Sequence, residues 1–289
     1  MTNPRRLAIG VFDSGVGGLT VLRALVERIP EADYLYFGDT ARLPYGSKSA
    51  ATVAHYAVGA VHYLQDRGAE MLVIACNTAT ALAFDKIKNA ARVGVIGVVE
   101  PGAEAAVCAS KRREIVVIGT EATVSSHAYR RALEMRKTAV REKACPLFVP
   151  LVEEGWTEHP VTEQVARIYL TEAFAGDFQD ADVLVLGCTH YPLIKPLLRR
   201  VVPERVAIVD SADSTAHAVA EQLGPSFGLR AASEQGLLTR DSRSAELPER
   251  RAHPRLKFFA TDSVEKFRKM GTRFLGYPVE DVEHVDLKE

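Results

Sequence analysis

Two cysteines occupy matching positions in the two halves of the chain. Cys76 ends the run Leu72-Val-Ile-Ala-Cys76, and Cys188 ends the run Leu184-Val-Leu-Gly-Cys188. Each precedes a helical pattern, so both are expected at helix N-termini, where free N–H groups lower the pKa of a thiol and attract carboxylates. A free cysteine is most often a small buried hydrophobe. Two of them in the same setting favour a chemical role.

A pair of opposed thiols suits the racemisation of an amino acid. One thiolate removes the α-proton, and a protonated thiol on the opposite face returns one, so the two groups exchange roles with the direction of the reaction. The other two cysteines, Cys108 in an expected helix and Cys145 before a proline, are interpreted as packing residues.

Polar residues also follow the first expected strand. Asp13 and Ser14 come directly after it, and Gly15, Gly17 and Gly18 come next. These glycines either let backbone amides approach a ligand or only form a turn. Their spacing matches neither of the usual phosphate-binding loops.

Later strand ends carry further candidates. His190 either relays a proton near Cys188 or caps a helix. Glu153 is expected at the end of a strand, and Glu154 beside it is nearly as good a candidate. Thr120 and Thr123 either bind a carboxylate or serve as ordinary helix caps.

These residues are positioned by short aliphatic runs that alternate with amphipathic helical patterns, which indicates parallel strands buried on both faces. The expected strands are Leu7–Phe12, Tyr34–Phe37, Met71–Ala75, Val93–Val99, Ile115–Ile118, Leu147–Val152, Val183–Leu186, Val206–Val209, Leu256–Ala260 and an edge strand in Val282–Leu287. A helix is expected from Ser263 to Phe274, and the polar segment 229–254 is expected to be an exposed loop.

The two halves of this pattern resemble each other. Four strands in each half end in polar residues or cysteines, at Asp13, Asp39, Cys76 and Glu100 and again near Thr120, Glu153, Cys188 and Asp210. The expected fold is therefore α/β, with two similar lobes, each a mostly parallel sheet flanked by helices, and an active site in the cleft between them. Since all βα units look alike, an accidental resemblance is the alternative.

Composition excludes several classes of protein. The 289 residues are 47% hydrophobic and carry a formal net charge of −1, so no nucleic-acid partner is expected. The four cysteines form no CxxC pair, which disfavours zinc ribbons and thioredoxin-type motifs, and no metal site is expected. Without a signal sequence or a membrane-length apolar run, the chain is expected to be cytoplasmic, with no membrane partner.

Four motifs together resemble the glutamate racemase family within the aspartate/glutamate racemase superfamily. They are Asp13-Ser-Gly-Val-Gly-Gly-Leu-Thr-Val21, Gly38-Asp-Thr-Ala-Arg-Leu-Pro-Tyr-Gly46, Ala75-Cys-Asn-Thr-Ala-Thr80 and Gly187-Cys-Thr-His-Tyr-Pro192. The resemblance implies lobes of residues 1–99 plus 210–289 and of residues 100–209. It also implies that the protein interconverts L- and D-glutamate without any cofactor. This reaction would supply D-glutamate for peptidoglycan.

The resemblance also implies roles for single residues. Cys76 would deprotonate the D-isomer with help from Asp13, and Cys188 the L-isomer with help from His190, with Glu153 nearby. The positions that match the family's substrate-binding residues are Asp13, Ser14, Tyr45, Gly46, Asn77, Thr78, Thr120, Thr123, Thr189 and His190. Because members of the family often form dimers, a homodimer is an expectation.

Rival functions remain open at this point. Aspartate or hydantoin racemisation uses the same scaffold, and aspartate differs from glutamate by one methylene. A decarboxylase of this type needs only one proton-delivering cysteine. A bilobal amino-acid-binding protein needs neither thiol in an equivalent position, and a thiol-redox protein would need thiols able to form a disulfide.

The two-thiol hypothesis makes a direct prediction. Cys76→Ala and Cys188→Ala should each abolish racemisation while leaving the fold intact, because each variant lacks the acid or the base on one face of the α-carbon. Polarimetry measures the activity and circular dichroism the fold. Full activity in either variant would rule out the mechanism.

Overall fold

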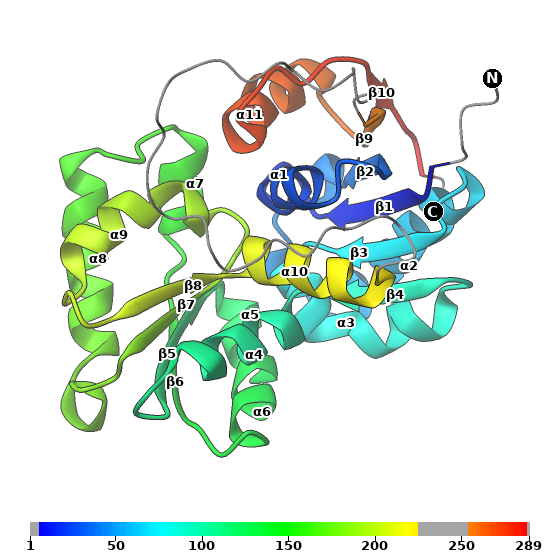
Figure 1. Cartoon of the computed structure of the whole chain (residues 1–289). Coiled ribbons are helices and arrows are strands. Elements are labelled where there is room, and N and C mark those ends of the chain that lie inside the picture. The colour runs from blue at the N-terminus through cyan, green and yellow to red at the C-terminus, as the bar shows by residue number, and fades with distance from the viewer. Residues whose placement is uncertain (1–5, 225–253, 288–289) are drawn as a thin grey trace, which may run out of the picture.

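The computed structural model describes residues 6–224 and 254–287, which form two parallel β-sheets flanked by helices (Figure 1). The six-stranded sheet has the order β10-β9-β2-β1-β3-β4, and the four-stranded sheet has the order β6-β5-β7-β8. The expected α/β fold with two lobes is therefore confirmed. All recorded strand pairs are parallel, so the carboxyl ends of the strands of each sheet lie along one edge.

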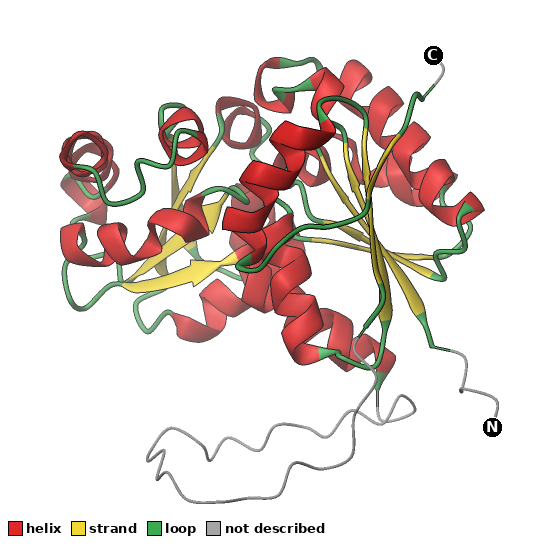
Figure 2. Cartoon of the chain, turned by 90° about the horizontal axis from the view of Figure 1, so that it is seen from above, coloured by secondary structure: helices red, strands yellow, loops and turns green. Residues whose placement is uncertain are grey.

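The six-stranded sheet is built from both ends of the described chain. Its strands are β1 (Ala8–Asp13), β2 (Asp33–Gly38), β3 (Met71–Ile74), β4 (Gly94–Gly97), β9 (Leu256–Ala260) and β10 (Val282–His284). The central strands β1 and β3 are almost wholly buried. This burial explains their unbroken aliphatic sequences, since helices cover both faces of the sheet (Figure 2).

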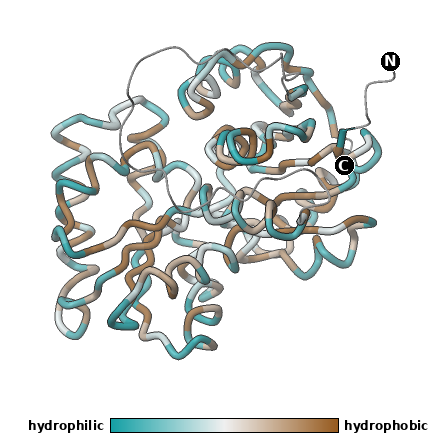
Figure 3. Tube along the Cα trace, viewed as in Figure 1, coloured by the Kyte–Doolittle hydropathy of each residue, from teal (hydrophilic) through white to brown (hydrophobic). Residues whose placement is uncertain are grey.

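The four-stranded sheet comes from the middle of the chain. It consists of β5 (Glu114–Gly119), β6 (Ala139–Ala144), β7 (Val183–Gly187) and β8 (Ala207–Asp210). Every residue of β7 is buried. Apolar residues gather along the strands of both sheets, and polar residues on the outer sides of the helices (Figure 3).

Helices connect the strands and cover the sheets. The α-helices are α1 (Leu19–Arg28), α2 (Ala50–Asp66), α3 (Asn77–Ala90), α4 (Val99–Ala109), α5 (Glu121–Ser125), α6 (Ala128–Glu134), α7 (Phe148–Glu153), α8 (Pro160–Ala173), α9 (Lys195–Val201), α10 (Ser211–Leu223) and α11 (Val264–Leu275). Short 3₁₀ turns are η1 (Thr40–Arg42), η2 (Tyr45–Ser47), η3 (Gly176–Phe178) and η4 (Tyr191–Ile194). Helix α10 packs against α1 and α4 and so joins the two lobes.

One expected strand is wrong. Residues Leu147–Val152 do not form a strand; they lie in and just before helix α7, so Glu153 ends a helix. The second strand of this sheet in chain order is instead β6, with the sequence Ala-Val-Arg-Glu-Lys-Ala. An edge strand pairs on one side only and tolerates charged residues, so this sequence lacks the apolar run by which the other strands are predicted. Pro150 fits the first turn of α7, where its missing N–H would have had no partner in the helix.

Smaller corrections concern boundaries and cysteines. The strand expected at Val93–Val99 spans only Gly94–Gly97, and helix α4 begins at Val99. The strand expected within Val282–Leu287 ends at His284. Cys145 is buried as expected, but Cys108 is exposed, because the buried side of α4 carries Val99, Ala103 and Ala106. Apart from residue 254, the polar segment 229–254 lies outside the described residues.

Among the described residues, no helix combines the length and the apolar character needed to cross a membrane.

Candidate active site

The carboxyl ends of strands from both sheets meet at one cavity of about 500 Å³. Cys76 follows β3 of the first lobe and Cys188 follows β7 of the second, and both line this cavity. The other lining residues are Ser14, Thr40, Leu43, Pro44, Tyr45, Gly46, Ser47, Asn77, Thr78, Thr120, Glu121, Pro146, Val149, Pro150, Glu153, Thr189, His190 and Lys266. The cavity therefore offers a thiol from each lobe to a single small ligand.

Cys76 lies at the N-terminus of α3, as the sequence predicts. Its sulfur accepts a hydrogen bond from the backbone N–H of Ala79 at 3.4 Å, and the thiol donates to Ser14 Oγ at 3.5 Å. Burial and then the nearby Asp13 carboxylate raise the pKa of Cys76 to about 12, against the smaller opposing effect of these hydrogen bonds. Cys76 is therefore a neutral thiol at pH 7.

Asp13 lies beside this thiol but does not line the cavity. It is 1% exposed, and its Oδ2 accepts a hydrogen bond from Gly15 N at 2.9 Å. Burial raises the pKa of Asp13, while His190 and the backbone N–H groups of Gly15, Gly18 and Ser14 oppose the rise. Among the described residues Asp13 Oδ1 has no hydrogen-bond partner. A buried carboxyl with a free oxygen is suited to exchanging a proton with its surroundings.

Cys188 has a different local setting from Cys76. A turn and the 3₁₀ segment η4 follow it. The expectation that Cys188 lies at the N-terminus of an α-helix is therefore wrong. The sulfur of Cys188 instead lies 3.9 Å from Nδ1 of His190, whose Nε2 lies 3.2 Å from Oε1 of Glu153. The sequence left Glu153 and Glu154 as alternatives, and the geometry brings Glu153 to His190.

The partners of His190 determine its charge. Burial alone would lower its pKa, but the contacts with Cys188 and Glu153 outweigh burial and raise the pKa to about 10. The hydrogen bond from His190 in turn lowers the pKa of Glu153. At pH 7 the pair is therefore an imidazolium beside a carboxylate.

Hydroxyl and amide groups complete the cavity. Thr78 Oγ1 lies 3.0 Å from Thr120 Oγ1 and 3.3 Å from Thr123 Oγ1, so these three hydroxyls join the lobes. Thr123 itself is buried behind this cluster and does not line the cavity, and Thr120 also caps α5. Asn77 accepts a hydrogen bond from the phenol of Tyr129 at 2.7 Å.

One of the glycines after β1, Gly17, lies at the contact between the lobes. A Cβ atom on Gly17 would lie 2.3 Å from Thr189 Oγ1 and 2.6 Å from His190 Nδ1. Thr20 Oγ1 also lies 3.1 Å from the carbonyl oxygen of Thr189 and can donate to it. The backbone of this loop therefore touches the residues that follow Cys188, and Gly17 is needed for that approach.

Asp39 supports the site, although the sequence did not mark it as a site residue. It is fully buried and accepts hydrogen bonds from Tyr45 Oη at 2.6 Å, Arg42 Nη1 at 2.9 Å and Thr261 Oγ1 at 2.9 Å. It thereby holds Tyr45 and the adjoining Gly46 at the cavity wall. Its place at the end of β2, inside the motif that ends at Gly46, was the available signal. Lys266, in α11, lies outside the four motifs and had no comparable signal.

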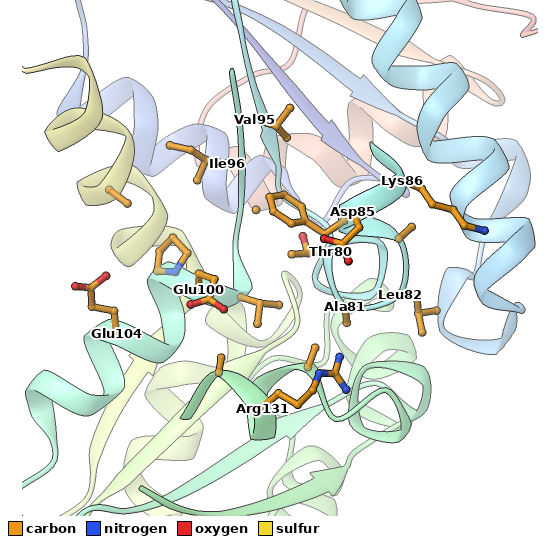
Figure 4. Close-up of a pocket in the computed structure, with 18 of the residues that line it drawn as sticks. Thr80, Ala81, Leu82, Asp85, Lys86, Val95, Ile96, Glu100, Glu104 and Arg131 are labelled. Carbon is orange, nitrogen blue, oxygen red and sulfur yellow. The ribbon is translucent and has the colours of Figure 1, made fainter. Parts of the chain in front are cut away.

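A second and larger cavity, of about 730 Å³, lies along residues 80–86 of α3 (Figure 4). Its lining comes from α3, β4, α4, α6 and α10, with Lys86, Glu100, Glu104 and Arg131 among the charged residues. No cysteine or histidine is among the described residues that line it. The smaller cavity, which holds the titratable groups with shifted pKa values, is therefore the candidate active site.

Within residues 6–224 and 254–287, no cluster of three or more His, Cys, Asp or Glu side chains has an arrangement that could hold a metal ion.

Residues 9–219 match the family model described as Asp/Glu/Hydantoin racemase. The chain belongs to this family. A glutamate racemase of Koribacter versatilis is 63% identical over 286 residues, which cover 98% of each chain. The expected membership of the glutamate racemase family, and with it a racemase activity, is confirmed by such full-length relatives.

Solved structures of the family agree with this assignment. A glutamate racemase isoform from Bacillus anthracis has a TM-score of 0.84 at 34% identity, with 97% of this chain and 98% of that chain covered. The glutamate racemase of Francisella tularensis in complex with D-glutamate has a TM-score of 0.81 at 32% identity, with 98% of each chain covered.

The packing of Gly17 against His190 predicts the effect of a single methyl group. Gly17→Ala should destabilise the fold by about 1–3 kcal/mol through overpacking and lower the racemisation rate by displacing His190 or Thr189. Urea unfolding and polarimetry measure the two effects. Gly59→Ala, in α2, is the control, because among the described residues a Cβ atom there meets only Leu287, at 3.9 Å. Equal behaviour of the two variants would contradict the prediction.

The Asp39 network predicts a defect in substrate binding. Asp39→Asn replaces one acceptor oxygen by a donor, so the hydrogen bonds from Tyr45 and Arg42 cannot both remain, and KM should rise about tenfold. The free energy of unfolding should fall by about 1–3 kcal/mol. Tyr45→Phe removes only the phenol and should give a smaller loss of stability. An unchanged KM in Asp39→Asn would show that this network does not hold the cavity wall.

Proposed function

We propose that this chain interconverts L- and D-glutamate by proton transfer between Cys76 and Cys188 without any cofactor. The observation that carries the proposal is the opposite electrostatic setting of two thiols lining one cavity. Cys76 lies near the Asp13 carboxylate, and Cys188 lies beside the His190 imidazolium. The raised pKa of Cys76 suits it to the role of acid, and the two thiols therefore have unlike neighbours from which to act on the two faces of one carbon.

The proposed reaction can start from L-glutamate. The Cys188 thiolate takes the α-proton, the C–H electron pair stays on the α-carbon, and Cys76 then donates its thiol proton to the opposite face. The product is D-glutamate, with a thiol at Cys188 and a thiolate at Cys76. The D-to-L direction runs through the same steps in reverse. His190, held by Glu153, stabilises the sulfur of Cys188 when it is negative. Asp13 assists proton transfer at Cys76.

The remaining lining residues suit a compact dicarboxylate. Hydroxyl groups of Ser14, Thr78, Thr120 and Thr189, with the amide of Asn77, supply donors for two carboxylates and acceptors for the ammonium group. Tyr45 and Gly46 form the facing wall. Aspartate is the second candidate substrate, because it has the same functional groups and is shorter by one methylene; the bound D-glutamate of the Francisella relative favours glutamate.

The wider setting follows from the same proposal. The product D-glutamate would serve peptidoglycan synthesis, with the protein in the cytoplasm, and a homodimer is the proposed assembly. The proposed lobes are residues 1–99 plus 210–289 and residues 100–209. Their support is that strands of the six-stranded sheet come from both ends of the chain and those of the four-stranded sheet from its middle.

The decisive experiment is incubation of the purified protein with L-glutamate in D2O without added cofactor. We expect optical rotation to decay to zero while deuterium enters the α-position, because the proton returned comes from a solvent-exchanged thiol. Polarimetry and the α-proton NMR signal follow both events. Cys108→Ser is the control, since this exposed cysteine lies outside the cavity and should be dispensable. If L-glutamate is unchanged and L-aspartate exchanges, the substrate assignment is wrong; if neither reacts, the racemisation proposal fails.

A further inference from the structure

The imidazole of His190 contacts a residue of the first lobe as well as its two second-lobe partners. Its nitrogen atoms face Cys188 and Glu153, and its ring lies against Phe274 of α11. The His190 and Phe274 ring centroids are 5.1 Å apart with an interplanar angle of 79°, an edge-to-face contact. Phe274 is fully buried, so this contact restricts the ring of His190 from the side of α11.

Glu153 is held from the same helix. Arg273, next to Phe274, donates a hydrogen bond through Nη1 to the backbone carbonyl oxygen of Glu153 at 3.1 Å. Gly155 leaves room for this guanidinium, since a Cβ atom there would lie 2.8 Å from Arg273 Nη1. Gly155 also has a φ of +81°, a conformation that favours glycine. A cationic side chain at the carbonyl end of α7 also matches the preference of helix C-termini for such groups.

A third residue of α11 acts on the carboxylate of Glu153. Lys266 lines the cavity together with Glu153, and it is the only Lys or Arg among the described residues of that lining. Its charge contributes to the lowered pKa of Glu153, after the larger contribution of His190. Two contacts and one electrostatic interaction from the same helix thus act on a single pair of residues in the other lobe.

We propose that α11 is a positioning element for proton transfer at Cys188, in which Arg273 and Phe274 hold Glu153 and His190 in line with the sulfur from across the lobe boundary. The inference rests on the proposed two-thiol racemisation and adds positioning residues to it. Neither Arg273 nor Phe274 is among the cavity-lining residues, so both act through Glu153 and His190.

This arrangement ties the geometry at Cys188 to the position of the Cys76 lobe. Helix α11 follows β9, which pairs with β2 in the six-stranded sheet. If the lobes separate, His190 and Glu153 lose the contacts with α11 and gain freedom to rotate. The pair is therefore best aligned with Cys188 when both lobes enclose the cavity, which is also when both thiols can reach one substrate.

Arg273→Gln is the sharpest test, because Arg273 is exposed and its loss should leave the core intact. We expect kcat to fall about five- to tenfold with KM changed less than about twofold, because Glu153 loses its backbone anchor and the alignment of His190 loosens. Arg268→Gln is the matched control; it makes the same substitution at an exposed position of α11, and the described structure records no hydrogen bond or ion pair from its side chain. Arg273→Lys keeps the donor and should recover kcat to within about twofold of the unmodified protein.

A second readout does not depend on turnover. The groups that face His190 are Cys188, Glu153 and Asp13, with Lys266 acting on Glu153. Because contact with Glu153 helps to raise the pKa of His190 to about 10, loosening Glu153 should lower that pKa. NMR titration of ¹³C-labelled histidine, assigned with His190→Asn, should show the midpoint about half a pH unit or more lower in Arg273→Gln and unchanged in Arg268→Gln.

The outcomes separate the two proposals. Equal kcat values and equal His190 midpoints in Arg273→Gln and Arg268→Gln would overturn the role of α11. An equal fall of kcat in both variants would also overturn it, because charge loss on α11 would then be the cause. If the unmodified protein does not racemise glutamate but the His190 midpoint still falls in Arg273→Gln alone, the positioning role stands and the proposed reaction fails.

Discussion

The close approach of the Gly17 backbone to the side chains of Thr189 and His190 is the tightest constraint on how the two lobes pack at the cavity. Gly17, in the loop after β1, lies against the side chains of Thr189 and His190 after β7, and Thr20 reaches the Thr189 carbonyl oxygen. Both loops follow central strands whose carboxyl ends are held by their sheets. Because this contact brings the strand ends together, Cys76 and Cys188 can line one cavity small enough for an amino acid.

Similar positions in the two lobes do not give the two thiols similar surroundings. Cys76 caps α3 and lies near a buried carboxylate, whereas Cys188 is followed by a 3₁₀ turn and lies beside a histidine paired with Glu153. The proposed reaction needs one acid and one base at a time. The unlike neighbours of the two thiols are the structural difference on which that proposal rests.

The last described part of the chain supports both walls of the cavity. Thr261, just after β9, donates to Asp39, which holds Tyr45 on the first-lobe side. Helix α11 then crosses to the second-lobe side, where Phe274 and Arg273 contact His190 and Glu153. A segment remote in sequence from both cysteines therefore contacts the residues that support the cavity wall on each side.

The sequence by itself determined the α/β class, most strands and the residues that follow them, because burial on two faces and helix capping leave local patterns. It missed β6 and assigned a strand to α7, since an edge strand need not be apolar and a short amphipathic run fits either structure. Only a family resemblance linked Asp13 to Cys76 and His190 and Glu153 to Cys188, and the tertiary structure supplied the contacts between these residues. The pairing of Glu153 with His190, the packing of Gly17, the acceptor role of Asp39 and the contacts of α11 join residues far apart in the chain, and no local periodicity records such contacts.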